Sequence, residues 1–169
     1  MYESPWCSFR LDEVRLPDGA EIEYGVLESA GFAAVVPVTE GGRVVLVRQW
    51  RQATRSFTLE LPGGGLEKGE DPEETARREL LEETGYRAEE LSRLICVCTS
   101  PGRSTEVCHL FRCRVAVRDL SGPRPEATEF VSVVELPFEE AVRKALNSEI
   151  SAATTVLGLL LASRGGSFT

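Results

Sequence analysis

Three glutamates that lie close together, Glu79, Glu82 and Glu83, carry the strongest chemical signal in the chain. Residues three and four apart share one face of an α-helix, so these carboxylates are expected to point in one direction. Like charges at this spacing repel one another unless a cation neutralises them. Mg²⁺ prefers oxygen ligands such as carboxylates and substrate phosphates. The spacing therefore predicts a magnesium site, and the alternative is an acidic helix face in solvent.

A glycine-rich segment, Pro62-Gly-Gly-Gly65, precedes the acidic cluster. Glycine has no Cβ, so the backbone of such a segment can approach a phosphate or a metal ion closely. Taken alone, these glycines predict only a tight turn. Next to an acidic cluster, they favour a site for a phosphate-bearing molecule.

The residues around the cluster predict a helix over 72–84. Asp71 is a good N-cap, Pro72 suits the first helical position, and Glu74 completes a capping box with Asp71. Gly85 is expected to end the helix. The three glutamates therefore belong to its last two turns.

The remaining pattern predicts strands before this helix and both strands and helices after it. The expected strands cover residues 9–15, 21–27, 32–38, 43–50, 94–99, 107–117 and 129–134. Further helices are expected over 138–146 and 151–163. The continuous apolar run 44–47 predicts a strand buried on both faces. This mixture predicts an α+β fold, with helices packed on a mostly antiparallel or mixed sheet.

The charge balance excludes some partners. The 169 residues include 19 Lys+Arg and 27 Asp+Glu, which gives a net charge of −8. We therefore expect no binding to nucleic acid or to an anionic membrane surface. A phosphate-bearing small molecule stays compatible, because a cation can bridge it to acidic residues. The length fits a single domain over residues 1–169.

The five cysteines and the single histidine do not have the spacing of common zinc sites. An odd number of cysteines without a Cys-x-x-Cys pair predicts reduced thiols and a cytoplasmic protein. Cys108 and His109 are adjacent, but strand neighbours point to opposite faces, so a nucleophile pair is not expected. Neither a signal peptide nor a membrane span is predicted.

The spacing around the acidic cluster resembles one family in detail. Gly64 is followed after five residues by Glu70, and after seven more by Arg78-Glu-Leu-Leu-Glu-Glu-Thr-Gly-Tyr86. Each fixed position is similar to the signature of the Nudix hydrolases, and a pattern of this length is far more specific than a short motif. The resemblance implies an α+β Nudix fold, which is an αβα sandwich with a mixed β-sheet. It also implies hydrolysis of a nucleoside diphosphate linked to another group.

The same resemblance implies a set of metal ligands. The backbone carbonyl of Gly63 and the side chains of Glu79 and Glu83 are expected to bind metal, with Glu82 as a frequent additional ligand. Mg²⁺ is the expected cofactor and Mn²⁺ the alternative. The metal would screen the charge of the diphosphate and lower the pKa of a bound water.

A general base is expected in the polar loop 118–128 or at its exit. In the branch of the family that the chain resembles, the base is often a glutamate of a loop distant from the motif. Glu126 is the expected base, and Glu129 a supplementary metal ligand. The alternative is that Glu82 or Glu83 activates the attacking water.

Segments outside the motif narrow the choice of substrate. Those that resemble the ADP-ribose pyrophosphatase branch are Val47-Arg-Gln-Trp-Arg51, Leu59-Glu-Leu-Pro-Gly63, Ser100-Pro-Gly102 and Glu106-Val-Cys-His-Leu-Phe111. The implied substrate is ADP-ribose or a related nucleoside diphosphate sugar, cleaved to a nucleoside monophosphate and a sugar phosphate.

Four residues of these segments or beside them are expected to bind the substrate. Arg51 would contact the diphosphate or the adjacent ribose, because a guanidinium matches phosphate geometry. Glu60 and Glu106 would bind ribose hydroxyls or shape the pocket, and Arg103 is expected to contact the substrate as well. The alternative for Arg51 is a surface cation at the end of a strand.

Members of this branch are usually homodimers whose N-terminal strands cross to the partner. The resemblance therefore implies a homodimer in which the strands over 9–27 form contacts. Trp6, Phe9 or Tyr24 would then stack on the adenine.

Two departures from the branch keep other functions open. Glu28-Ser-Ala-Gly31 stands where Glu-His-Pro-Gly is usual, and Gly63 stands where alanine is often found. Alternative substrates are GDP-mannose, a dinucleotide or a modified nucleoside triphosphate. A non-catalytic module that senses a nucleotide is a further alternative, although such modules usually lose the glutamates of the motif.

Overall fold

A seven-stranded mixed sheet forms the centre of the computed structural model, which describes residues 2–4, 7–118 and 131–164. Its strands are β4 (Phe32–Thr39), β5 (Arg43–Arg51), β6 (Ser56–Glu60), β7 (Gly63–Gly65), β8 (Tyr86–Cys98), β9 (Val107–Arg118) and β10 (Val131–Pro137). The main order is β10-β5-β4-β9-β8, with β6 paired to β5 and β7 paired to β4. Strands β4 and β9 are parallel, and the other described pairs are antiparallel.

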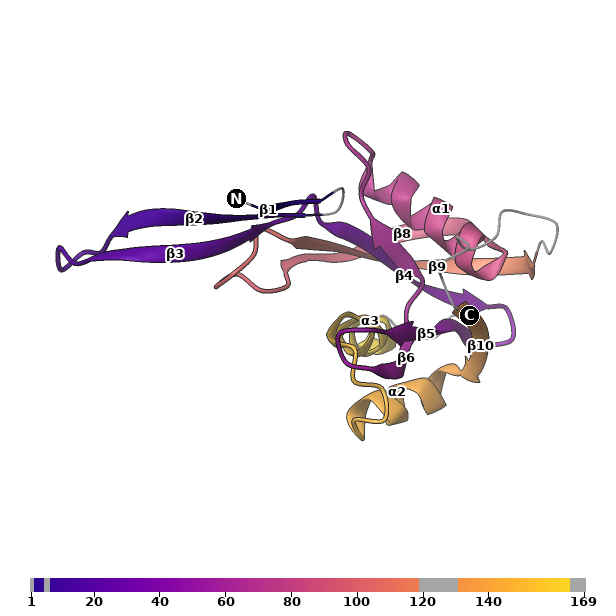
Figure 1. The fold of residues 1–169 in the computed structure, drawn as a ribbon. Helices are drawn as coiled ribbons and strands as arrows, with labels where there is room; N and C mark the ends of the chain where they lie inside the picture. The colour runs from indigo at the N-terminus through magenta and orange to yellow at the C-terminus, as the bar shows by residue number, and fades with distance from the viewer. Residues whose placement is uncertain (1, 5–6, 119–130, 165–169) are drawn as a thin grey trace.

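Three helices cover the two faces of the sheet. Helix α1 (Pro72–Thr84) lies on one face, and α2 (Phe138–Leu146) and α3 (Ala153–Arg164) lie on the other (Figure 1). The predicted α+β fold, an αβα sandwich with a mixed sheet, is therefore confirmed. None of the helices in the described part of the chain has the length and apolar character needed to cross a membrane.

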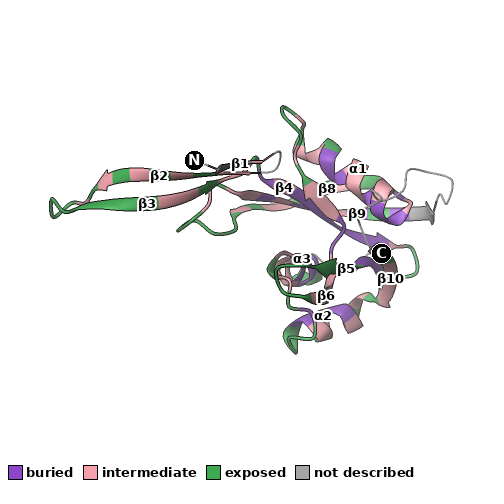
Figure 2. Cartoon of the chain, viewed as in Figure 1, coloured by how far each residue is buried: buried purple, intermediate pink, exposed green. Residues whose placement is uncertain are grey.

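The sheet separates two apolar clusters because alternate residues of a strand point to opposite faces. One cluster joins the sheet to α2 and α3 and includes Val36, Leu46, Leu110, Ala141 and Leu159. The other joins it to α1 and includes Val35, Val45, Phe111, Ala76 and Leu80. Figure 2 shows that β4 is largely buried, and residues 44–47 of β5 are buried as well. The predicted burial of residues 44–47 on both faces is therefore confirmed.

A second sheet at the N-terminus projects away from the sandwich. It contains β1 (Tyr2–Glu3), β2 (Ser8–Arg15) and β3 (Glu21–Glu28), in that order (Figure 1). The β2–β3 turn closes through a hydrogen bond of 2.9 Å from the Gly19 amide to the Leu16 carbonyl. Gly19 has a φ of 89°, a conformation that glycine adopts without strain. Most side chains of this hairpin are exposed or half-buried.

Helix α1 begins and ends where the sequence predicts. The Asp71 side chain accepts a hydrogen bond of 2.7 Å from the Glu73 amide, which satisfies one of the free donors of the first turn. Gly85 follows the helix with a φ of 75°, and its amide donates to the Leu81 carbonyl. The three glutamates of the motif are therefore on a well-formed helix.

The structure differs from the sequence prediction at β6, β7 and β8. The glycine-rich segment is a strand rather than a turn, because residues 63–65 pair with residues 32–34 of β4. Strand β8 begins at Tyr86, earlier than predicted, since its charged first half lies at the edge of the sheet and alternates poorly. Strand β6 is short and pairs only with the end of β5.

Helix α3 is tied to the segment that leads into β7. Thr155 is 1% exposed, and its hydroxyl accepts a hydrogen bond of 2.9 Å from the Leu61 amide. A buried amide that loses its acceptor costs free energy, because no water replaces the bond. The glycine strand thus has its entry fixed from the face opposite α1.

We predict that Thr155→Val lowers the free energy of unfolding by about 1–3 kcal/mol, because the isosteric valine leaves the Leu61 amide without an acceptor. Urea unfolding followed by circular dichroism measures the change. Ser163→Ala is the control, since it removes an exposed hydroxyl of the same helix that donates to the Leu160 carbonyl. A Thr155→Val protein as stable as the control would contradict the assigned role.

Candidate active site

The C-terminal half of α1 packs directly against the glycine strand β7. The Gly63 amide donates a hydrogen bond of 2.9 Å to Oε2 of Glu83, whose side chain is almost fully buried. A Cβ on Gly64 would overlap the Glu79 carboxylate. A Cβ on Gly63 would overlap the Ala33 carbonyl oxygen. Glycine at position 64 therefore lets the Glu79 carboxylate approach the backbone of β7, and glycine at position 63 lets β7 lie close to β4.

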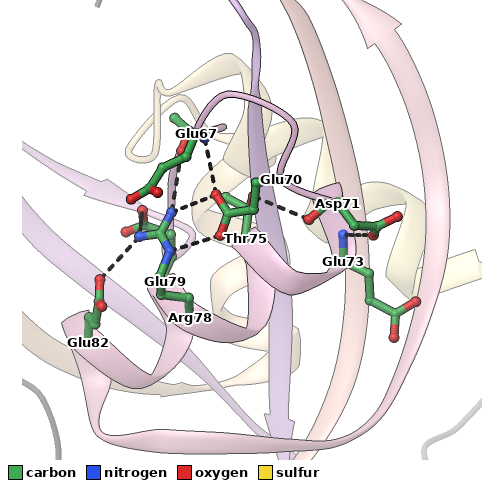
Figure 3. A network of polar contacts seen from close by, with 9 residues as sticks. Glu67, Glu70, Asp71, Glu73, Thr75, Arg78, Glu79 and Glu82 are labelled. Atoms are coloured by element: carbon green, nitrogen blue, oxygen red, sulfur yellow. Dashed lines mark hydrogen bonds and ion pairs between the residues drawn. The ribbon is translucent and has the colours of Figure 1, made fainter. Parts of the chain in front are cut away.

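Arg78 is the centre of a network of ion pairs beside this contact (Figure 3). Its Nε and Nη2 donate to the two oxygens of Glu70 at 3.0 and 3.1 Å. Its Nη1 donates to Glu79 at 2.7 Å and to Glu82 at 3.2 Å. The contact with Glu82 joins residues four apart on the helix, and the bidentate pair with Glu70 joins the helix to the turn before it. One guanidinium therefore orients three carboxylates.

This network shifts the ionisation of its members. The hydrogen bonds from Arg78 lower the pKa of Glu70 to about 2, and the Glu67 amide also donates to Glu70. The pairing with Glu70 and then the charge of Glu79 raise the pKa of Arg78 above its ordinary value. Glu70 and Arg78 therefore stay charged throughout the ordinary pH range.

The carboxylates of this region suit a hard divalent cation. Glu79 and Glu83 lie next to the glycine backbone, and carboxylate and carbonyl oxygens are the donors that such cations prefer. In their present conformations, however, no three His, Cys, Asp or Glu side chains among the described residues converge on one point. Glu79 and Glu82 face Arg78, and Glu83 faces Gly63. Arg78 thus supplies part of the positive charge that neutralises these glutamates, whereas the sequence analysis attributed that charge to a metal ion alone.

Arg51 and Glu60 form a bidentate ion pair at the β5–β6 hairpin. Nε and Nη2 of Arg51 donate to the two oxygens of Glu60 at 2.9 and 2.6 Å, and the Thr58 hydroxyl donates to Glu60 as well. Burial would raise the pKa of Glu60, but the hydrogen bonds from Arg51 and Thr58 outweigh it and lower the pKa. The pair keeps the half-exposed guanidinium of Arg51 in one orientation.

The loop between β8 and β9 carries the other two predicted substrate contacts. Arg103 is exposed at its tip, and Glu106 is half-buried at its end. The Thr99 hydroxyl donates to Oε1 of Glu106 at 2.6 Å, and the Glu106 amide donates to the Ser104 hydroxyl at 3.0 Å. The loop is therefore closed by its own polar groups.

These parts gather at one end of the sheet. Strand β5 is antiparallel to β4, so its last residue, Arg51, lies at the end where β4 begins. Strand β9 is parallel to β4, so the loop before it reaches the same end. The Leu66 amide, just after β7, donates to the Gly31 carbonyl there. The strand directions thus point Arg51 and the loop that carries Arg103 and Glu106 toward the same end of the sheet, although β4 and β5 pair only at Val38 and Val44.

Two predicted site residues, Glu126 and Glu129, lie outside the described residues, as does Trp6. Phe9 and Tyr24 are both exposed on the N-terminal hairpin, but on opposite faces. The predicted roles of the site residues, including Glu82 as a ligand or base, stay predictions.

The adjacent residues Cys108 and His109 do not form a nucleophile pair. Cys108 belongs to the cluster below α2 and α3, whereas His109 pairs with Ala33 of the cluster below α1. Burial raises the pKa of the Cys108 thiol to about 11, so it stays protonated and unreactive at neutral pH. Burial and the nearby Arg93 lower the pKa of His109.

The sequence did not predict several residues that hold the site in place. The Glu70–Arg78 pair joins the turn before α1 to the middle of the helix, and neither helical nor strand periodicity in the sequence indicates such a pair. Gln49 is buried beside the Arg51–Glu60 pair, and here the two-residue alternation of β5 was a usable signal. The tie between Thr155 and Leu61 joins residues far apart in the sequence, so only the fold reveals it.

Comparisons with known proteins agree with this geometry. A family model described as the NUDIX domain matches residues 29–155. A second model, described as the nucleoside diphosphate sugar hydrolase N-terminal domain, matches residues 1–27, which contain the projecting hairpin up to Leu27. The boundary between the two matches falls at the end of β3.

Relatives that cover most of the chain include the following three. The methanol dehydrogenase activator of Bacillus methanolicus is 35% identical over 150 residues, which are 89% of this chain and 81% of the relative. The ADP-ribose pyrophosphatase of Bacillus subtilis is 35% identical over 149 residues, 88% of this chain and 80% of the relative. The GDP-mannose pyrophosphatase of Cronobacter sakazakii is 38% identical over 136 residues, 75% of this chain and 70% of the relative. Helix α1, which carries the three glutamates, packs on the glycine strand β7 inside an αβα sandwich. Together with this geometry, the matches show that the chain belongs to the Nudix hydrolase family.

Proposed function

We propose that this protein hydrolyses the diphosphate of ADP-ribose or a related nucleoside diphosphate sugar. The products are a nucleoside monophosphate and a sugar phosphate. The observation that carries the proposal is the contact of Glu79 and Glu83 with the glycine backbone of β7. In that arrangement the carboxylates lie next to glycine backbone, which a phosphate can approach closely because glycine has no side chain. The relative named ADP-ribose pyrophosphatase supports the choice of substrate.

Nudix hydrolases generally use divalent metal ions, and we assign Mg²⁺ here, with Mn²⁺ as the alternative. The carbonyl of Gly63 and the carboxylates of Glu79 and Glu83 would hold it, with Glu129 as a further ligand. When bound, the metal supplies positive charge to the phosphate oxygens and lowers the pKa of water. Arg78 holds Glu79 and Glu82 in fixed rotamers before any ligand arrives, which limits the entropy lost on binding.

The side chains at the end of the sheet bind and orient the substrate. Arg51, fixed by Glu60, directs a planar guanidinium at the diphosphate or its ribose. Arg103 and Glu106 bind the substrate from the loop before β9. Glu126 takes the proton of the attacking water, and Glu82 is the alternative base because its carboxylate is half-exposed beside Arg78.

A second candidate substrate is GDP-mannose, which the name of the Cronobacter relative favours. Base recognition separates the two candidates, and the described residues show no feature that selects one base. A non-catalytic nucleotide sensor is disfavoured, because all three glutamates of the motif are present and ordered by Arg78 or Gly63.

The test is turnover with Mg²⁺ on a panel of ADP-ribose, NADH, GDP-mannose and a modified nucleoside triphosphate, with products separated by liquid chromatography. We expect AMP and ribose 5-phosphate from ADP-ribose. Glu83→Gln is predicted to lower kcat at least about a hundredfold, the scale of a lost transition-state contact. Glu74→Gln, an exposed change of the same kind on the same helix, is the matched control. Equal rates for the two variants, or no hydrolysis by the unmodified protein, would refute the proposal.

The pairing of Glu70 with Arg78 predicts a pH-dependent contribution to stability. The pKa of Glu70 is lowered to about 2, so the pair stabilises the folded state above the unfolded pKa of about 4.3. That contribution disappears as the pH falls towards 2, because the carboxylate becomes protonated in both states. We expect Glu70→Gln to lower the free energy of unfolding by about 1–3 kcal/mol at pH 7 and by much less near pH 2. Urea unfolding at several pH values measures this, and a difference independent of pH would contradict it.

We propose that the protein forms a homodimer through the apolar face of its N-terminal hairpin. The register places Phe9, Leu11 and Leu27 on one face, with exposed fractions of 41, 60 and 40%. Contiguous apolar surface of this kind marks a protein contact.

We treat the hairpin as part of the one domain predicted over residues 1–169. Its five free thiols are typical of a reducing compartment, and we place it in the cytoplasm.

We predict that Leu11→Glu shifts the protein from dimer to monomer, since a charge would be buried in the contact. Sedimentation velocity at several protein concentrations measures the change. Leu146→Glu is the control, because Leu146 is 66% exposed on α2, outside the hairpin. A dimer that survives Leu11→Glu would place the contact elsewhere.

A further inference from the structure

Hydrogen bonds join the N-terminal hairpin to the loop between β8 and β9. The Leu27 amide donates to the Arg103 carbonyl at 2.8 Å, and the Thr105 amide donates to the Leu27 carbonyl at 3.0 Å. The Tyr24 hydroxyl donates to the Gly102 carbonyl at 2.5 Å. The end of β3 therefore forms a short parallel pairing with this loop, and Tyr24 adds a side-chain tie at its tip.

These bonds fix the backbone on both sides of Arg103. The Arg103 amide donates to the Ser100 carbonyl at 2.9 Å, and its own carbonyl accepts from Leu27. The preceding carbonyl, that of Gly102, accepts from Tyr24. The direction in which the Arg103 side chain leaves the backbone is thus set by three hydrogen bonds. The side chain itself is exposed and forms no ion pair with any residue that the structure describes.

Tyr24 is the one side chain of the hairpin among these contacts. It stands opposite Asp12 in the register, on the face away from Phe9 and Leu27. Tyr24 is 39% exposed, so burial alone does not explain a tyrosine at this position. The hydroxyl, by contrast, reaches a backbone carbonyl 78 residues away in the sequence. The hydroxyl and the ring can therefore be tested separately.

We propose that Tyr24 is a positioning residue for substrate binding. Its hydroxyl holds the Gly102 carbonyl, and the loop then presents the Arg103 guanidinium to a phosphate of the nucleoside diphosphate sugar. A cation whose backbone is fixed before binding loses less conformational freedom when it meets the phosphate, so it binds more tightly. This inference rests on the proposed function and assigns part of its substrate affinity to the N-terminal hairpin.

The first test compares Tyr24→Phe, which keeps the ring, with the unmodified protein in ADP-ribose hydrolysis with Mg²⁺. We expect KM to rise about three- to tenfold, the scale of one lost hydrogen bond, with kcat changed less than about twofold. Ser163→Ala is the matched control, because it also removes an exposed hydroxyl that donates to a backbone carbonyl. An unchanged KM in Tyr24→Phe, or a loss confined to kcat, overturns the proposal.

A double-mutant cycle with Arg103→Ala tests whether Tyr24 acts through Arg103. In the Arg103→Ala background, Tyr24→Phe should raise KM by less than about 1.5-fold, because the side chain that it positions is already absent. Effects on KM that simply multiply would show that Tyr24 acts on the substrate independently of Arg103. That outcome overturns the proposal as well.

Amide hydrogen exchange measured without substrate separates this inference from the proposed function. Tyr24→Phe should accelerate exchange at the amides of Arg103 and Ser104 about threefold or more, and Ser163→Ala should not. Unchanged exchange at these amides means that the hydroxyl does not hold the loop, whatever the activity. Absence of hydrolysis by the unmodified protein would instead overturn the proposed function and, with it, the role in substrate binding.

Discussion

The close packing of helix α1 on the glycine strand is the constraint on which the site depends. A carboxylate as buried as that of Glu83 must keep a hydrogen-bond donor, because an unpaired buried charge is very costly. The Gly63 amide is that donor, so a movement of α1 away from β7 would leave the buried Glu83 carboxylate without its hydrogen bond. Strand β7 is in turn held by β4 on one side and, through Leu61, by Thr155 of α3. The position of two glutamates therefore depends on both faces of the sandwich.

Charge balance around Arg78 sets how ready the site is for a cation. The guanidinium is bound on one edge by Glu70, and it shares its remaining contacts between Glu79 and Glu82. A divalent ion at Glu79 would compete for an oxygen that Arg78 already binds, whereas Glu70 keeps the guanidinium close by. The affinity for such an ion would therefore be the difference between two electrostatic interactions rather than the relief of simple repulsion.

The sequence predicted helix α1 far better than the glycine strand and the contacts of Arg51. Asp71, Pro72 and Gly85 mark the ends of α1 through local hydrogen bonds, so the helix was found with its correct bounds. The glycine strand was missed because its conformation comes from pairing with β4, a partner distant in the sequence. The bidentate pair of Arg51 with Glu60 was likewise out of reach, since a β-turn must first bring the two strands into register. Single residues were named as candidates from the sequence, but their mutual contacts required the fold.

This division explains how one catalytic arrangement can serve different nucleotides. The glutamates are placed by helix α1 and its hydrogen bond with β7, neither of which belongs to the N-terminal hairpin. Arg103, by contrast, is placed by the end of β3, which lies outside the residues matched by the NUDIX model. A change in the hairpin would therefore move Arg103, the proposed substrate contact, without touching the glutamates. Relatives of 35–38% identity that carry the names of different substrates are what such a separation of chemistry from recognition would produce.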